Sequence, residues 1–236
     1  MKSHSRILVC LFALVVVAGC ASTKVSNRQI LVNEKIPRPD HIWVYDFAST
    51  PGEVPPDSAI AGQVSEPSTL PTAEQIAAGR QAGAEVAMAL VEDIRAMGLP
   101  AERASIGTKL QINDLVIRGY FLSIEEGSTA KRVAIGFGAG ASELKAAAEG
   151  YRMTPTGLQK LGSGTVDSGG SKSPGAALAV VGLAATANPA GLIISSGVKA
   201  YGEASGSSRI EGRAKAVAQE IAETIKPRFQ QQGWIN

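Results

Sequence analysis

Few side chains in this sequence are of the types that carry out metal or nucleophilic chemistry. The 236 residues include only two cysteines and two histidines. A tetrahedral zinc site needs several thiolate or imidazole ligands, and Cys-His or Ser-His catalysis needs a base beside its nucleophile. His41 stands at the start of a predicted strand, where we expect a solvent-facing side chain rather than a ligand or a base. The sequence therefore predicts no metal site, no cofactor and no catalytic residues, and we expect the protein not to be an enzyme.

Paired carboxylates are the second type of residue that could do chemistry, as general acid and general base. Two adjacent pairs occur, Glu92-Asp93 in a predicted helix and Glu125-Glu126 at the end of a predicted strand. In both elements, neighbouring side chains point in different directions. We therefore interpret both pairs as solvated surface.

A glycine-rich stretch at residues 133–141, VAIGFGAGA, has the spacing of a dinucleotide-binding fingerprint. Gly136, Gly138 and Ala141 fit the pattern G-x-G-x-x-A, which requires a following helix and an acidic residue about 20 residues on to hold the ribose. The corresponding region, TPTGLQKLGSG, has no acid, and Gly150 interrupts the supposed helix. We interpret the glycines as a bend or bulge where backbones pass closely, and we expect no bound nucleotide.

The first 20 residues are typical of a bacterial secretory signal. Lys2 and Arg6 precede an uncharged apolar run of 13 residues, which is too short for a membrane span of about 20 residues. The run ends in Val17-Ala18-Gly19-Cys20, which resembles the bacterial lipobox. The resemblance implies that residues 1–19 are removed as a signal peptide, and that Cys20 is lipidated on its sulfur and acylated at the new N-terminus.

Loss of the signal changes the charge and the thiol content of the protein. Without Lys2 and Arg6 the 23 basic residues become 21, equal to the 21 acidic residues, so the formal charge falls from +2 to zero. No basic stripe then remains to neutralise phosphates, and we expect no nucleic-acid partner. Cys10 leaves with the signal and Cys20 carries the lipid, so we expect neither a disulfide nor a free thiol.

The expected lipid places the protein in the cell envelope. Lipoprotein modification supplies several acyl chains, and two or more chains anchor a protein stably. Ala21, rather than aspartate, follows the cysteine, and by resemblance to lipoproteins in general this favours sorting to the outer membrane. We expect a periplasm-facing protein whose partners are the membrane, through the lipid anchor, and an envelope protein or further copies of itself.

The rest of the chain predicts a single α/β domain over residues 41–236. Residues 20–40 are polar and end near two prolines, so we interpret them as the lipidated N-terminus and a tether. Residues 42–47 are apolar on both faces, which is typical of a strand in the middle of a covered sheet. Residues 115–125 are rich in β-branched and aromatic side chains and predict a long strand.

A β-hairpin is predicted at residues 142–166, although their alanine content favours a helix. Pro155 and Gly157 supply the turn. In the first strand the even-numbered positions from 144 to 150 form an apolar face. Glu149 and Tyr151 then belong to the opposite face, and we expect them to point toward solvent.

An amphipathic helix is predicted after residue 72. Thr72 and Gln75 form a capping box, and apolar residues recur behind them at three- and four-residue spacing. Gly98 supplies the stop. Because the apolar stripe is narrow and the outer face carries mixed charges, we expect this helix to pack on the core.

A second helix is predicted near the C-terminus. Ser208 and Glu211 form its capping box, and one apolar stripe follows. Pro227 is expected to kink or end this helix, after which Phe229 and Trp234 fold back onto the core. The chain as a whole therefore predicts an α/β (α+β) fold, with a small mixed sheet of about five strands packed by two amphipathic helices.

Two segments lack such periodicity. Residues 49–71 contain five prolines, and we interpret them as a flexible loop. Residues 173–206 form an apolar, Gly- and Ala-rich insertion that includes 26 consecutive uncharged residues. Three interpretations of the insertion remain open: a buried helical hairpin that covers the sheet, a segment that enters the membrane or forms oligomers, and a flexible loop.

Several motifs together resemble one family of bacterial lipoproteins. They are the signal and lipobox, LVIRGYF, IGFGAGASELKA, TPTG, NPAGLI and GRAKAVAQEIAETIKPRFQQQGW, within roughly residues 40–236. On these motifs the chain is similar to the bacterial lipoproteins of domain of unknown function 4410. The resemblance implies an envelope lipoprotein with a small α/β core, and it brings no catalytic residues. The layout is more loosely similar to curli-secretion lipoproteins and to the N-terminal domain of the Tol periplasmic protein.

The sequence leaves two functions open. We expect an outer-membrane-anchored periplasmic lipoprotein, non-enzymatic, with a structural or assembly role in the cell envelope. The alternative is a membrane-inserted oligomeric pore or secretion component that uses residues 173–206. An unlipidated Cys20→Ala variant separates them, because a fully soluble monomer would remove the alternative.

Overall fold

The computed structural model describes residues 23–58, 72–125, 143–169, 193–194 and 207–236. The predicted signal peptide, Cys20 and the glycine-rich stretch lie outside these residues. So does the apolar insertion, except Ile193 and Ile194. The predictions for these parts of the chain stay predictions.

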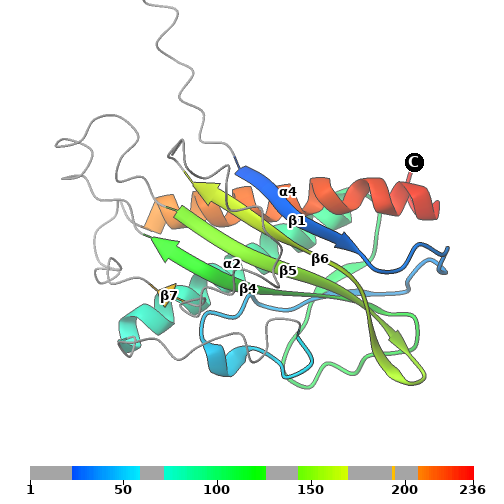
Figure 1. The fold of residues 1–236 in the computed structure, drawn as a ribbon, viewed down its shortest axis with the longest axis horizontal. Coiled ribbons are helices and arrows are strands. Elements are labelled where there is room, and N and C mark those ends of the chain that lie inside the picture. Colours follow the sequence, from blue (N-terminus) through cyan, green and yellow to red (C-terminus); the bar gives the residue numbers. More distant parts are fainter. Residues whose placement is uncertain (1–22, 59–71, 126–142, 170–192, 195–206) are drawn as a thin grey trace, which may run out of the picture.

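The described chain forms one mixed β-sheet with two long helices on one of its faces (Figure 1). The strands are β1 (Thr23–Ile30), β2 (Ile42–Val44), β3 (Ala101–Arg103), β4 (Leu115–Glu125), β5 (Glu143–Thr154), β6 (Gly157–Gly169) and β7 (Ile193–Ile194). Their order is β1-β6-β5-β4-β2-β3, and β7 pairs with β4. The helices are α2 (Ala73–Ala96), α4 (Ser207–Gln232) and the short 3-10 helix η1 (Pro51–Glu53). The predicted α/β class is confirmed, and the sheet has seven strands rather than about five.

The N-terminal strand β1 shows that the prediction of a tether is wrong for residues 23–30, whereas residues 20–22 lie outside the described chain. β1 pairs antiparallel with β6, with Thr23 opposite Ser168. The chain stays attached after the strand, because Ile36 is buried and its N–H donates to Oε1 of Gln232 at 2.8 Å. Polar composition indicated a tether, but an edge strand is held by backbone hydrogen bonds and tolerates polar side chains.

The strand predicted at residues 42–47 takes the central place expected of it, although its regular part ends at Val44. β2 lies between β4 and β3 and is parallel to both. Just beyond it, the Phe47 N–H donates to the Gly83 carbonyl of α2 at 3.2 Å. A Cβ at Gly83 would lie 2.1 Å from the Phe47 oxygen, so this close approach of helix and strand requires glycine.

The predicted hairpin is confirmed as β5 and β6, which pair antiparallel along their length. Gly157 has φ of +116°, the left-handed region that the turn needs and glycine adopts freely. On the helix side, Leu144 is buried as predicted. The prediction for the other face is wrong, because Glu149 and Tyr151 are only 2% and 3% exposed.

Helix α2 begins and ends where the sequence predicts. Thr72 Oγ1 accepts from the Gln75 N–H at 3.3 Å, and Gln75 Oε1 accepts from the Thr72 N–H at 2.8 Å. Gly98 follows the helix with φ of +82°. The stripe packs on the core as expected; its buried members are Ala78, Gly79, Ala82, Gly83, Val86, Ala87, Leu90, Val91 and Ile94.

Helix α4 packs against α2 and against the sheet. It begins at Ser207, so Ser208 lies within its first turn instead of capping it. Pro227 does not end the helix, which continues to Gln232. Phe229 and Trp234 are buried with their ring centroids 5.4 Å apart, which confirms that this end folds back onto the core.

The described piece of the apolar insertion is a strand. Ile193 and Ile194 form β7 and pair in parallel with Ser123 and Ile124 of β4, so these two residues extend the sheet and are not helical. Within the described ranges, none of the helices combines the length and the apolar character that a membrane crossing would need.

Candidate functional site

A segment predicted as flexible loop covers the sheet face opposite the helices. Residues 49–58 run along this face and include η1. Glu53 holds the segment in place, because its Oε2 accepts from the backbone N–H of Ser49 and Thr50 and its Oε1 pairs with Arg80 of α2 at 2.6 Å. The prediction of a flexible loop over residues 49–71 is therefore wrong for 49–58, and residues 59–71 lie outside the described chain.

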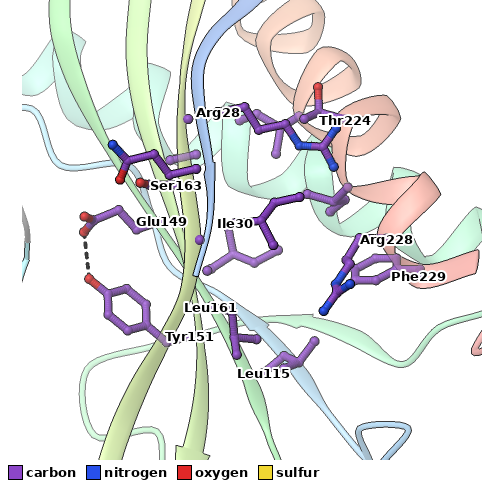
Figure 2. A pocket seen from close by; sticks show the side chains of 18 of the residues that line it. Arg28, Ile30, Leu115, Glu149, Tyr151, Leu161, Ser163, Thr224, Arg228 and Phe229 are labelled. Carbon is purple, nitrogen blue, oxygen red and sulfur yellow. Dashed lines mark hydrogen bonds between the residues drawn. The ribbon is translucent and has the colours of Figure 1, made fainter. Parts of the chain in front are cut away.

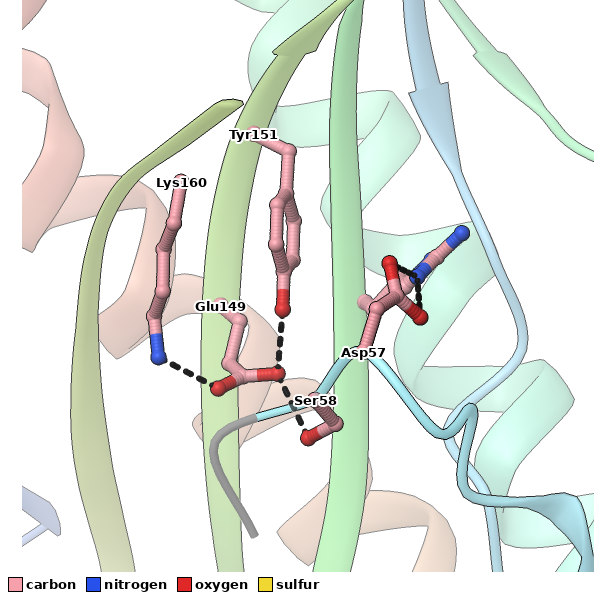
Figure 3. Close-up of polar contacts among 6 residues, drawn as sticks. Asp57, Ser58, Glu149, Tyr151 and Lys160 are labelled. Atoms are coloured by element: carbon pink, nitrogen blue, oxygen red, sulfur yellow. Dashed lines mark hydrogen bonds and ion pairs between the residues drawn. The ribbon is translucent and has the colours of Figure 1, made fainter. Parts of the chain in front are cut away.

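Glu149 lies at the centre of a buried polar cluster under this segment (Figure 3). Its Oε1 pairs with Lys160 Nζ of β6 at 2.6 Å. Its Oε2 accepts from the hydroxyls of Tyr151 and Ser58, each at 2.8 Å. We call these four residues, Ser58, Glu149, Tyr151 and Lys160, the Glu149 cluster. It joins the covering segment to both strands of the hairpin.

The contacts within the Glu149 cluster shift the pKa values of Glu149 and Tyr151 in opposite directions. Burial acts to raise the pKa of Glu149, but hydrogen bonds from Lys160, Tyr151 and Ser58 outweigh it and lower the pKa below its usual value. Burial, followed by the hydrogen bond to Glu149, raises the pKa of Tyr151. The carboxylate is thus ionised at neutral pH with both oxygens engaged, whereas a general base needs a lone pair directed at a substrate. This arrangement suits a structural role.

Arg118 of β4 extends the polar contacts of this face. Its Nη1 lies 3.0 Å from both carboxylate oxygens of Asp57 in the covering segment. Its guanidinium also lies over the rings of Tyr45 and Tyr151, at 5.7 and 5.4 Å from their centroids, within cation–π range. Since the Arg118 side chain is only 15% exposed, these contacts tie the segment to the sheet.

Sequence reasoning missed the Glu149 cluster for a specific reason. Alternation along a strand indicates which residues share a face, but not what covers that face. The alternation correctly predicts that Glu149 and Tyr151 share one face, but the expectation that this face is solvated is wrong. A tyrosine two residues from a carboxylate on the same face was the only available signal of burial.

His41 has contacts that the sequence did not reveal. Its Nδ1 lies 3.3 Å from Oδ1 of Asp114, and its ring stacks on Trp43 with centroids 5.4 Å apart. Asp114 is 1% exposed, and its Oδ2 accepts from Trp43 Nε1 at 2.9 Å and from the Gln111 N–H at 2.8 Å. The His41 side chain is 34% exposed, so it is neither freely solvated nor buried. Asp114 therefore braces the starts of β2 and β4 against each other.

The other predicted chemical residues lie as follows. Glu92 is exposed and Asp93 half-buried on α2, and burial, with Glu92 and Glu223 nearby, raises the pKa of Asp93. Among the residues that the structure describes, no group of three or more His, Cys, Asp or Glu side chains is placed to hold a metal ion. Cys20, the predicted lipidation site, lies outside them.

An apolar cavity of about 160 Å³ lies on the helix face, between β1, the neighbouring strands and α4 (Figure 2). Its apolar walls include Val25, Ile36, Leu161, Val166, Ile225 and Phe229. The polar residues that line it are Arg28 and Gln29 of β1, Glu149 and Tyr151 of β5, Ser163 of β6, and Thr224, Arg228 and Gln232 of α4. Arg228 is engaged by its own chain, since its Nη2 donates to the Val32 carbonyl at 2.6 Å. The sequence does not predict this cavity, because one of its walls is β1, for which the polar composition predicts a tether.

Comparison with known proteins identifies a family and distant likenesses of fold. The sequence model of the family described as "Domain of unknown function (DUF4410)" matches residues 42–189, from β2 to beyond β6. No curated protein matches the sequence. The chain is similar to the PelC dodecamer from Paraburkholderia phytofirmans, with 13% identity and a TM-score of 0.39 over 85% of this chain and 98% of that chain. A variant of that dodecamer in another crystal form gives 12% identity and a TM-score of 0.39, over 87% and 97%.

Proposed function

The chain belongs to the family of domain of unknown function DUF4410, and on this premise we propose that it is a lipid-anchored component of the bacterial cell envelope. In this proposal Cys20 carries the lipid, the anchor lies in the outer membrane, and the folded domain faces the periplasm. The role is structural or one of assembly, without catalysis. The supporting sequence feature is the signal that ends in Val17-Ala18-Gly19-Cys20.

The observation that carries the proposal is the position of β1. Its first residue, Thr23, follows Cys20 by three residues. Three residues span at most about 11 Å. A lipid on Cys20 would therefore hold the end of the sheet that contains Thr23 directly at the membrane surface, with no long tether between them.

Other parts of the chain meet the sheet at this same end. Thr23 is opposite Ser168 of β6, and Glu143, the first residue of β5, is opposite both Gly169 and Glu125. The apolar insertion at residues 173–206 follows β6 in sequence, and β7 within it pairs near the end of β4. An apolar segment that contains 26 consecutive uncharged residues and is attached next to a lipid anchor fits a role at the membrane or at a partner there.

The buried carboxylates support the non-enzymatic part of the proposal. Glu149 is engaged by Lys160, Tyr151 and Ser58. Asp114 is engaged from another part of the fold, by the Trp43 indole among others. Both carboxylates stabilise contacts between elements, which suits a scaffold that presents surfaces.

The anchor is tested by labelling and fractionation of cells that express the full chain. With radioactive palmitate, the wild type and a Cys10→Ala control are expected to carry label and to fractionate with the outer membrane, because Cys10 lies in the signal. Cys20→Ala, expressed behind a cleavable secretory signal in place of residues 1–19, is expected to lose the label and to become soluble. Label that persists in Cys20→Ala, or an unlabelled wild type, would refute the proposal.

The same variant distinguishes the pore alternative. A Cys20→Ala protein that is recovered without detergent as a monomer supports the anchored scaffold. A Cys20→Ala protein that stays in the membrane and needs detergent for extraction contradicts it. That result would favour insertion of residues 173–206 into the bilayer.

A further inference from the structure

The apolar cavity has the size and surroundings of a ligand site. At about 160 Å³ it is close to the engineered apolar cavity of about 150 Å³ that stays dry and takes a benzene molecule. Its polar lining residues include Arg28 of β1 and Thr224 of α4, and the one carboxylate among them, Glu149, is already engaged by its own cluster. We infer that this cavity binds the alkyl chain of a small anionic amphiphile, with the chain between the sheet and α4 and the headgroup at Arg28.

Gly150 indicates that the space is kept open. It lies within β5, lines the cavity, and a Cβ built on it would meet no atom within 4 Å. Its φ is outside the left-handed region, so the backbone does not require glycine. Glycine within a strand weakens the strand, and it is often found where a ligand or another backbone approaches closely. Within the described residues no other backbone fills the space at Gly150, which fits the approach of a ligand.

Arg28 supplies the charge for the headgroup. It is exposed, and within the described chain it makes no hydrogen bond or ion pair. Figure 2 shows its side chain extending from β1 toward α4 on the side of Thr224, whose hydroxyl can donate to an anion. Arg228 is already engaged by the carbonyls of Val32 and Glu34. The free guanidinium therefore selects a carboxylate or phosphate over a cationic or neutral head.

The cavity volume limits the length of the chain. A space that takes a six-carbon ring holds an alkyl segment of roughly six to eight carbons. Octanoate is therefore the probe that fits. The inference does not depend on the lipid anchor, so binding is measured on the full chain with Cys20→Ala, and its failure would leave the anchor proposal untouched.

Titration calorimetry with octanoate below its micelle concentration provides the test. We expect one molecule to bind per chain, and octyltrimethylammonium, with the same tail and a cationic head, to bind about tenfold more weakly or worse. Arg28→Gln is expected to weaken the binding of octanoate about tenfold and to leave the binding of 1-octanol unchanged. The matched control is Lys24→Gln, an exposed cation on the same strand that does not line the cavity.

Filling the cavity tests the location of the site. Gly150→Leu is expected to abolish octanoate binding without lowering the thermal midpoint, and Ala148→Leu, at a second lining position, gives the same test if the first variant folds poorly. Absence of octanoate binding to the parent chain would overturn the inference, and so would undiminished binding to a folded filled variant. Equal affinity for both headgroups would overturn the role of Arg28. Native mass spectrometry of the protein from cells then distinguishes a free fatty acid from a phospholipid by the mass that remains bound.

Discussion

The two faces of the sheet are covered by side chains of opposite character. On the face under residues 49–58, polar groups fill the space and engage one another, with Glu149 held by Lys160, Tyr151 and Ser58. On the helix face, the side chains are almost all apolar, and between β1 and α4 they leave a cavity of about 160 Å³.

The contrast separates stability from binding. A buried polar cluster stabilises a fold only while every member keeps its partner, so it tolerates little change. An empty apolar cavity lowers the stability of the fold, so substitutions that fill it with larger side chains should be tolerated or stabilising. The polar face is therefore expected to be sensitive to loss of groups, and the cavity region of the helix face to accept added atoms.

The largest expected effect is the loss of the Glu149 carboxylate. Glu149→Ala leaves the Lys160 ammonium and two hydroxyls without their acceptor, which should cost about 3 kcal/mol of unfolding free energy. Urea unfolding of the Cys20→Ala chain measures it. Glu102→Ala, which removes an exposed carboxylate from β3, is the control and should change stability by less than about 0.5 kcal/mol. Equal, small effects of both changes would mean that the polar face is not braced by Glu149.

The pH dependence of stability provides a second test of the polar face that carries Glu149. Because the folded-state pKa of Glu149 is lowered, its contribution is present above the ordinary value of 4.5 and is lost as pH falls through the lower folded value. Glu149→Gln cannot titrate, so between pH 7 and pH 3 it should lose less stability than the parent chain does. The difference should be smaller than the effect of Glu149→Ala, since the glutamine can keep part of the hydrogen bonding. Identical pH profiles for the two proteins would contradict the lowered pKa.

Sequence reasoning succeeded where a local signal decides the structure. The capping box of Thr72 and Gln75 and the stop at Gly98 depend on neighbouring residues only, and the structure has both. It failed where a segment distant in sequence determines whether a residue is in a strand or is buried. Thr23–Ile30 is a strand because β6 offers its edge, and Glu149 is buried because residues 49–58 cover it. The cavity depends on both β1 and α4, which are far apart in sequence, so no local pattern could predict it.

On the helix face, Gly119 lies at a tightly packed position that has no room for a side chain. A Cβ at this position of β4 would lie 2.1 to 2.3 Å from three carbons of the Phe47 ring, which is itself buried. Gly119→Ala should therefore destabilise the fold by about 1–3 kcal/mol through overpacking. Combining it with Phe47→Leu, which removes ring atoms, should cost less than the two single changes added together. Simple additivity in that double-mutant cycle would count against a direct clash.

The smallest expected effect has the opposite sign, at Gly150 on the same face. Apart from its chain neighbours, no described residue has an atom within 4 Å of where a Cβ at Gly150 would lie, and its φ suits any residue. Gly150→Ala should then stabilise the fold by about 0.5–1 kcal/mol, because alanine restricts the unfolded chain and suits a strand interior better than glycine. Gly157→Ala controls for this entropy, since Gly157 also has open space but sits at φ +116°, where alanine is strained. If Gly150→Ala stabilises the fold while Gly119→Ala and Gly157→Ala destabilise it, open space and backbone conformation together determine the sign of the stability change. A loss of stability in Gly150→Ala would mean that the cavity does not extend to this strand.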